Sequence, residues 1–119
     1  MRTKFRSSVV AVARRFGLSK TSQYQFPRIL TVHDIPPFNC RFEVTNPIED
    51  SRVEGYAREA EFTSMIVSEL KATDVLYDVG ACIGMVTIHA AKAVGCRVVS
   101  FEPDPGFRGR LLRNLSLNG

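Results

Sequence analysis

A nucleotide-like ligand could be bound by two glycines together with two acidic residues. One acid comes before the glycines, and the other follows the next apolar segment. The stretch Asp78-Val79-Gly80-Ala81-Cys82-Ile83-Gly84 follows a short apolar run, and Glu102 lies 24 positions after Asp78. Gly80 permits a tight turn and close approach of a ligand to the backbone, and Gly84 lets a following helix pack near the strand. Free N–H groups at the start of that helix could bind a carboxylate or phosphate. Because Glu102 stands about where dinucleotide folds place the acid that binds ribose hydroxyls, the pattern favours an adenosine-containing ligand.

The spacing of the glycines discriminates between ligands. The nicotinamide fingerprint requires G-x-G-x-x-G, whereas this loop has only Gly80 and Gly84, with Cys82 in place of the middle glycine. A pyrophosphate could therefore approach the backbone of this loop less closely than in the nicotinamide-binding fingerprint. No G-x-x-x-x-G-K-[ST] occurs in the chain, which excludes the loop of P-loop nucleotide triphosphatases. The alternative interpretation is that the loop binds no ligand and is only a glycine turn that joins a strand to a helix. The presence of Glu102 makes this alternative less favourable.

The segments around the loop predict strand, helix, strand and helix in turn. The apolar run 75–79 predicts a strand, 85–94 a helix closed by Gly95, and 97–101 a second strand. Asp104 and Pro105 are typical of an N-cap and a first helical position. The apolar side of the last helix is expected to comprise Leu111, Leu112 and Leu115. Such alternation predicts parallel strands whose carboxyl ends form a binding crevice.

The first half predicts smaller elements. Residues 29–33 and 40–45 favour a β-hairpin with one apolar face, and Asn46-Pro47 breaks that pattern. Phe62, Ile66 and Leu70 recur at helical spacing and predict a helix over 58–70. Three regions follow: a basic arm with a short amphipathic helix (1–27), a β-hairpin and connection (28–57), and the start of a ligand-binding α/β domain (58–119).

Composition bounds the function classes. The 119 residues are 45% hydrophobic and 24% charged, which is ordinary for a globular domain. Residues 1–33 carry seven Lys and Arg and no acid, but basic solvated tails are common, so no specific nucleic-acid partner is expected. No apolar run approaches the roughly 20 residues of a membrane span. The three cysteines are scattered, which indicates reduced thiols in a cytoplasmic protein. The two histidines, His33 and His89, are isolated and are expected to be packing or surface residues. No group of these residues has the spacing of metal ligands, so no metal site is expected.

Four short blocks of sequence are more specific together than the glycine loop alone. They are Glu59-Ala60-Glu61-Phe62-Thr63, Tyr77-Asp78-Val79-Gly80-Ala81-Cys82-Ile83-Gly84, Phe101-Glu102-Pro103-Asp104-Pro105 and Leu112-Arg113-Asn114-Leu115-Ser116-Leu117-Asn118. In order and spacing they resemble the FkbM-type S-adenosylmethionine-dependent methyltransferases, over residues 41–119. The resemblance implies an α/β, Rossmann-like methyltransferase fold that is incomplete here, with its first two β/α units preceded by a helix and a β-hairpin.

The resemblance also implies roles for individual residues. Asp78, Gly80, Ala81 and Gly84 are expected to line the methionine side of S-adenosylmethionine, Glu102 to hold the ribose hydroxyls, and Pro103 to lie near the adenine. Cys82 stands where the family usually has Asn, so its backbone is expected to contact the cofactor. Glu59 and Glu61 are expected to help close the site. No catalytic residue is assigned, because the later strands that bring the acceptor site in this family are not in the chain.

Three functions are consistent with the residues. The first is the cofactor-binding half of an FkbM-like enzyme that methylates an oxygen of a small molecule or sugar. The second is a noncatalytic binding module with a basic arm, and the third is a fragment of an NAD(P)-dependent oxidoreductase. Self-association through the exposed edge of the incomplete sheet is expected in addition.

Overall fold

The first described elements form a β-hairpin. The computed structural model describes residues 24–55 and 57–119, so the predicted basic arm and its helix lie largely outside the described residues. Strands β1 (Arg28–Val32) and β2 (Cys40–Val44) pair antiparallel, with Leu30 opposite Phe42. Alternate side chains of β2 point into the core, where Cys40, Phe42 and Val44 are fully buried. The prediction of a hairpin with one apolar face is confirmed, with each strand one residue from its expected bounds.

A helix follows the hairpin where the sequence predicted only a break. Helix α2 (Pro47–Glu54) begins after Asn46, whose extended backbone and side-chain oxygen cap the N–H groups of Ile48 and Glu49. Pro47 occupies the first helical turn, where a missing N–H costs nothing. The Asn-Pro pair therefore starts a helix as well as ending a strand, and the predicted plain connection over this segment is wrong.

The next helix, α3 (Ala57–Glu69), agrees with the predicted 58–70, but its inner face is shifted. Phe62, expected on the apolar side, is 55% exposed, whereas Thr63 is fully buried. The helix packs against α4 (Met85–Val94). The apolar spacing thus located the helix correctly and misplaced its buried face by about one position.

The second half forms the predicted alternation of strands and helices. Strands β3 (Val75–Val79) and β4 (Arg97–Phe101) pair in parallel and are joined by α4, with the bounds expected from the sequence. Gly95 ends α4 with a left-handed φ of 73°. Asp104 caps α5 (Pro105–Asn118) by accepting a hydrogen bond from the N–H of Phe107 over 2.8 Å. Leu111 is buried on that helix, but Leu112, predicted beside it, is 62% exposed.

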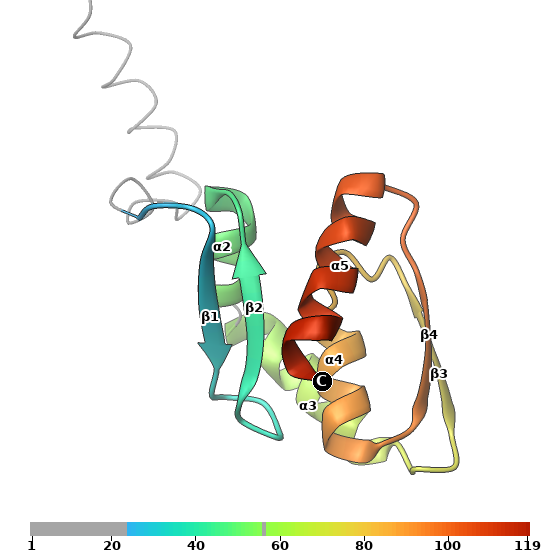
Figure 1. Ribbon diagram of the computed structural model, residues 1–119. Helices are drawn as coiled ribbons and strands as arrows, with labels where there is room; N and C mark the ends of the chain where they lie inside the picture. Colours follow the sequence, from blue (N-terminus) through green and yellow to red (C-terminus); the bar gives the residue numbers. More distant parts are fainter. Residues whose placement is uncertain (1–23, 56) are drawn as a thin grey trace, which may run out of the picture.

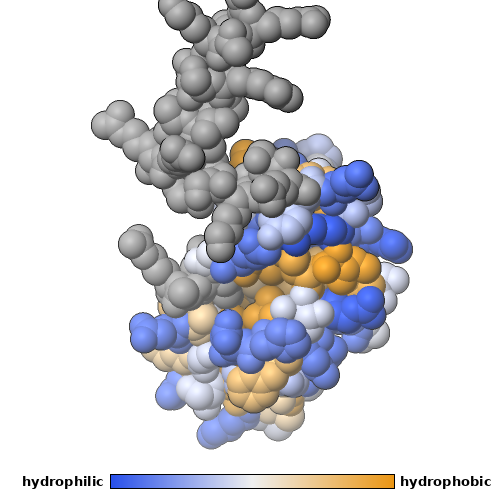
Figure 2. Space-filling view, turned by 90° about the vertical axis from the view of Figure 1, so that its left-hand side faces the viewer, coloured by the Kyte–Doolittle hydropathy of each residue, from blue (hydrophilic) through white to orange (hydrophobic). Residues whose placement is uncertain are grey.

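Helices α4 and α5 lie between the hairpin and the parallel strands (Figure 1). One core joins both halves, because Phe42 and Val44 of β2 belong to the same buried cluster as Ile83 and Ile88. The space-filling view onto the hairpin side shows an apolar area bordered by polar residues (Figure 2). Within the described residues, no helix combines the length and apolar character needed to cross a bilayer.

The opposite face of the β3–β4 pair is open to solvent. Tyr77 and Val79 on β3 are 64% and 80% exposed, and the Tyr77 ring stacks on Phe101 with centroids 6.2 Å apart. Parallel strands are normally covered on both faces. The described residues therefore form a partial α/β fold with helices on one side of its parallel strands.

Candidate active site

The glycine loop is held against the end of the neighbouring strand. Gly80, with a φ of 83°, lies in the left-handed region that favours glycine, which confirms the predicted tight turn. The N–H groups of Gly80 and Ala81 both donate to the carbonyl oxygen of Phe101, over 2.8 and 3.1 Å. Nothing lies within 4 Å of the position that a Cβ on Gly80 would occupy. The loop is thus fixed by β4 and leaves open space beside its first glycine.

Glu102 closes the other side of this turn. Its Oε2 accepts a hydrogen bond from the N–H of Cys82 over 2.8 Å, and its Oε1 accepts one from the N–H of Asp104 over 2.9 Å. Cys82 has a φ of 52°, an uncommon conformation for a residue with a side chain. A carboxylate offers about four lone-pair sites. Glu102 therefore has two oxygens oriented by backbone and still has capacity to accept from ligand hydroxyls.

Gly84 brings two helices together. It is the N-cap of α4, with a φ of 96° and no side-chain cap. A Cβ on Gly84 would lie 2.5 Å from Cδ1 of Leu111 on α5. The sequence predicted that this glycine lets the helix pack near the strand. Helix α4 does contact β4, and the close approach that the absent side chain of Gly84 permits is to α5.

Asp78 is oriented by the hydroxyl of Thr87, which in turn lies beside that of Ser100; the sequence analysis singled out neither residue. Thr87 on α4 donates to Asp78 Oδ2 over 2.6 Å, and its hydroxyl lies 2.7 Å from that of Ser100 on β4. Ser100 is also the cross-strand neighbour of Asp78. The carboxylate has no basic side chain within ion-pair distance in the described part of the chain. Asp78 is thus a fixed and unneutralised negative charge at the end of β3.

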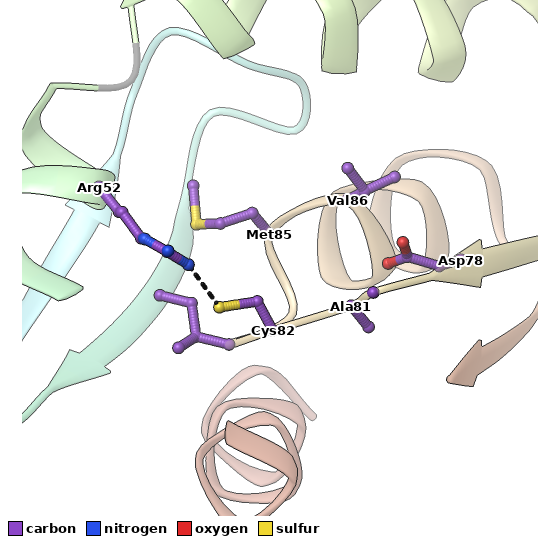
Figure 3. A pocket seen from close by; sticks show the side chains of 8 residues that line it. Arg52, Asp78, Ala81, Cys82, Met85 and Val86 are labelled. Atoms are coloured by element: carbon purple, nitrogen blue, oxygen red, sulfur yellow. Dashed lines mark hydrogen bonds between the residues drawn. The ribbon is translucent and has the colours of Figure 1, made fainter. Parts of the chain in front are cut away.

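The loop and the end of β3 border a pocket of about 300 Å³ (Figure 3). Four of the seven residues expected to bind a cofactor line it: Asp78, Gly80, Ala81 and Cys82. The other three, Gly84, Glu102 and Pro103, do not line it. Glu102 nevertheless holds the loop through Cys82, and Pro103 is exposed. The remaining lining residues are Arg52, Ile83, Met85 and Val86.

Arg52 is the lining residue that no sequence signal indicated. It comes from α2, thirty positions before the loop, and its Nη1 donates to Cys82 Sγ over 2.8 Å. Burial raises the pKa of the Cys82 thiol, and the positive charge of Arg52 opposes that shift. The side chain reaches the pocket only because α2 packs on the hairpin, beside the loop (Figure 3). Since α2 itself was not predicted, Arg52 could not be placed.

The remaining candidates lie elsewhere. Glu61, expected to help close the site, borders a separate hollow with Asp34 and Ser64, so that prediction is wrong; the side chain of Glu59 lies outside the described residues. His89 is fully buried and stacks on Phe42, which confirms a packing role. Among the described residues, no group of three or more His, Cys, Asp and Glu is placed to hold a metal ion.

Comparison with known proteins gives one significant relative. The chain is 31% identical, over 106 residues, to the hexuronic acid methyltransferase AglP of Haloferax volcanii. The match covers 88% of this chain and 42% of that protein, so the chain spans less than half of its relative's length. A match of that extent must include the loop from Asp78 to Gly84 and Glu102. No protein family and no solved structure matches significantly. The chain is therefore distantly related to a methyltransferase.

Proposed function

We propose that this chain is the cofactor-binding part of an S-adenosylmethionine-dependent methyltransferase of the FkbM type. In this proposal residues 58–119 form the start of a Rossmann-like domain, and the hairpin and α2 pack on it through the shared core. The observation that carries the proposal is the hydrogen bond from Cys82 N to Glu102 Oε2. It places the acid of the next parallel strand beside the glycine loop, and adenosine-binding α/β folds use an acid at about this position to bind ribose hydroxyls.

Charge favours S-adenosylmethionine over a nicotinamide dinucleotide. Asp78 places an unneutralised carboxylate in the pocket, 2.6 Å from its orienting hydroxyl. That charge attracts an amino or sulfonium group and repels a pyrophosphate. Cys82 also adds a side chain where close phosphate approach calls for glycine. The pocket of about 300 Å³ is at the lower end of the size of small-molecule sites.

The residues present can account for binding and orientation. S-adenosylmethionine, when bound, supplies an electrophilic methyl group on a positively charged sulfur. Asp78 would stabilise positive charge on the methionine side, and Glu102 would accept from the ribose hydroxyls. Backbone N–H groups of the loop and Pro103 would contact the rest of the cofactor. No described residue is assigned to the acceptor or to its deprotonation.

For the acceptor we propose a sugar acid or related small molecule that is methylated on oxygen. The support is the relative, whose name states that it methylates a hexuronic acid. Methyl transfer depends mostly on holding the acceptor oxygen in line with the methyl group. In this proposal that task falls to a part of the enzyme corresponding to the share of the relative that this chain does not match.

Calorimetric titration with S-adenosylhomocysteine tests the cofactor assignment. The wild-type chain should bind it saturably and should not bind NAD under the same conditions. Glu102→Gln should weaken binding about tenfold, because a neutral amide is a poorer partner for two hydroxyls than a carboxylate. Glu61→Gln, an exposed acid outside the pocket, is the matched control and should leave the affinity unchanged.

A deoxy ligand separates a contact by Glu102 from its support of the loop. With the 2′-deoxy analogue of S-adenosylhomocysteine, Glu102→Gln should have a much smaller effect, because a hydroxyl partner is already missing. An equal effect on both ligands would assign Glu102 to holding Cys82 alone. Preference for NAD would instead support the oxidoreductase alternative.

A further inference from the structure

Arg52 has no carboxylate partner among the side chains that the structure describes. Among these side chains, three other arginines form ion pairs: Arg28 with Asp50 and Glu54, Arg110 with Glu43 and Glu49, and Arg113 with Glu43. Among the side chains that the structure describes, those of residues 24–55 and 60–119, no acid lies within ion-pair distance of Arg52. Its described contacts are the hydrogen bond to Cys82 Sγ and a 5.6 Å approach to the Phe107 ring. The charge of Arg52 is therefore not neutralised by any of these described side chains.

The guanidinium keeps donors available to a ligand. Arginine has five N–H donors in a planar fork, and a thiol is a weak acceptor for one of them. The contact with Cys82 holds the guanidinium at the edge of the loop, and the ring of Phe107 supports it from α5. A fork positioned in this way is suited to bidentate binding of a carboxylate.

The pocket thus carries opposite charges at two sides. Figure 3 shows Arg52 entering from α2 on one side and Asp78 at the end of β3 on the other, with Ala81 and Met85 between them. An α-amino acid group carries both a carboxylate and an ammonium, so it offers a partner to each of these two charges. A simple anion such as phosphate would meet the repulsion of Asp78.

We propose that Arg52 binds a ligand carboxylate in this pocket, namely the carboxylate of the methionine part of S-adenosylmethionine. The assignment rests on the proposed function. Arg52 takes the carboxylate and Asp78 the ammonium, so the two side chains fix the direction in which the cofactor lies along the loop. The carboxylate of a sugar-acid acceptor has the same chemistry, and the experiment below distinguishes the two sources.

The test compares two ligands that differ in the amino acid group. S-adenosylhomocysteine has it, and 5′-methylthioadenosine lacks it. Each is titrated by calorimetry into the wild-type chain and into Arg52→Gln, Arg52→Lys and Arg97→Gln. Arg97 is the matched control, because it is exposed, has no described ion pair and lies at the far end of β4 from Glu102. Thermal unfolding of each variant shows whether it is folded.

Arg52→Gln should lower the affinity for S-adenosylhomocysteine roughly tenfold to a hundredfold, as expected for loss of a charge-assisted hydrogen bond. It should change the affinity for 5′-methylthioadenosine less than about twofold, and Arg52→Lys should lose less than Arg52→Gln because it retains the charge. Arg97→Gln should leave both affinities unchanged. Equal weakening of both ligands, or no weakening of S-adenosylhomocysteine, would overturn the assignment to the cofactor.

Glucuronate supplies the second arm, titrated into the chain saturated with S-adenosylhomocysteine. Binding that Arg52→Gln abolishes, without a change in the S-adenosylhomocysteine affinity, would show that the carboxylate is that of an acceptor. If the wild-type chain binds both adenosine ligands and Arg52→Gln changes the affinity for none of the ligands, the assignment to Arg52 is contradicted while the proposed function stands. Failure of the folded wild-type chain to bind either adenosine ligand would contradict the proposed function itself, and this assignment with it.

Discussion

The side-chain amide of Asn114 donates a hydrogen bond to the carbonyl oxygen of Ile83 over 3.0 Å. The same amide accepts, through Oδ1, a hydrogen bond from the backbone N–H of Glu43 over 2.8 Å. One fully buried side chain on α5 thus connects the glycine loop to strand β2 of the hairpin. The loop is held by β4, by α5 and, through Asn114, by β2, and not by its own glycines alone.

Replacing Asn114 should therefore lower the free energy of unfolding by more than the loss of one side chain implies. Asn114→Ala would leave a buried N–H of Glu43 and a buried carbonyl of Ile83 without partners, at about 2–4 kcal/mol of unfolding free energy. Asn118→Ala is the control, because Asn118 makes similar bonds to the backbone of Arg41 in a more exposed setting. Its expected cost is about 1 kcal/mol. Urea unfolding measures both, and equal losses would contradict the structural role of Asn114.

Gly84 should tolerate a methyl group much less well than Gly95. Both have left-handed φ values, 96° and 73°, so alanine at either costs about 1–2 kcal/mol of backbone strain. Only at Gly84 would the new Cβ meet another side chain, Leu111 Cδ1 at 2.5 Å. Gly84→Ala should lose at least 1 kcal/mol more unfolding free energy than Gly95→Ala. Similar values in urea unfolding would show that Leu111 moves aside freely.

Local signals predicted the second half of the fold well. The bounds of the two parallel strands and of the helix between them follow from apolar runs that end at glycines, and Asp104 and Pro105 mark the start of α5. These signals work because each depends on a few adjacent residues. Asn46 and Pro47 carry the same kind of signal for α2, but the pair is equally typical of the end of a strand, so the local sequence alone does not distinguish the two structures.

Contacts between distant segments were beyond sequence patterns. Phe62 and Leu112 are apolar residues at helical spacing, yet both are exposed, because spacing does not show which side of a helix a neighbour covers. Arg52 enters the pocket from an element thirty residues before the loop. The loop residues could therefore be named from the sequence, while the cation that completes the pocket could not.

His89 should make stability depend on pH. Burial lowers the pKa of His89 below its ordinary value near 6.5, although a hydrogen bond to the Met85 carbonyl opposes the shift. That bond requires the proton on Nδ1, and buried Nε2 has no partner among the described residues. Below about pH 6.5 the unfolded chain binds a proton that the folded chain does not, so stability falls as pH falls.

The expected slope is at most about 1.4 kcal/mol per pH unit between pH 6.5 and the lower pKa of the folded state. Urea unfolding at several pH values from 5 to 7.5 measures it. His89→Gln should remove this contribution, and His33→Gln, at an exposed site, should leave it intact. A slope that persists in His89→Gln would assign the dependence to other groups.

The open face of the parallel strands should drive self-association. Tyr77 and Phe101 form an exposed aromatic pair there, and the two-stranded sheet has unpaired edges in the described part of the chain. Tyr77→Lys should shift sedimentation profiles toward the monomer, because a charge disfavours both apolar contact and strand pairing. Ile48→Lys introduces the same charge at an equally exposed residue of α2 and should have no effect. Equal effects would indicate net charge, and not the β3–β4 face, as the cause.

Cys82 should be the first thiol to react, and Arg52 should control its rate. Cys82 is half-buried at the pocket, whereas Cys40 and Cys96 are buried. Burial raises the pKa of the Cys82 thiol above its ordinary value near 9.0, and the Arg52 charge opposes that shift. Arg52→Gln removes the opposing charge, so less thiolate is present at pH 8.5 and alkylation by iodoacetamide should slow severalfold. Mass spectrometry of the modified peptides measures the rate at each cysteine, with Arg97→Gln as the unchanged control.

Saturating S-adenosylhomocysteine should protect Cys82 from alkylation if the ligand occupies this pocket. Faster reaction in Arg52→Gln would mean that the arginine shields the thiol sterically more than it stabilises the thiolate.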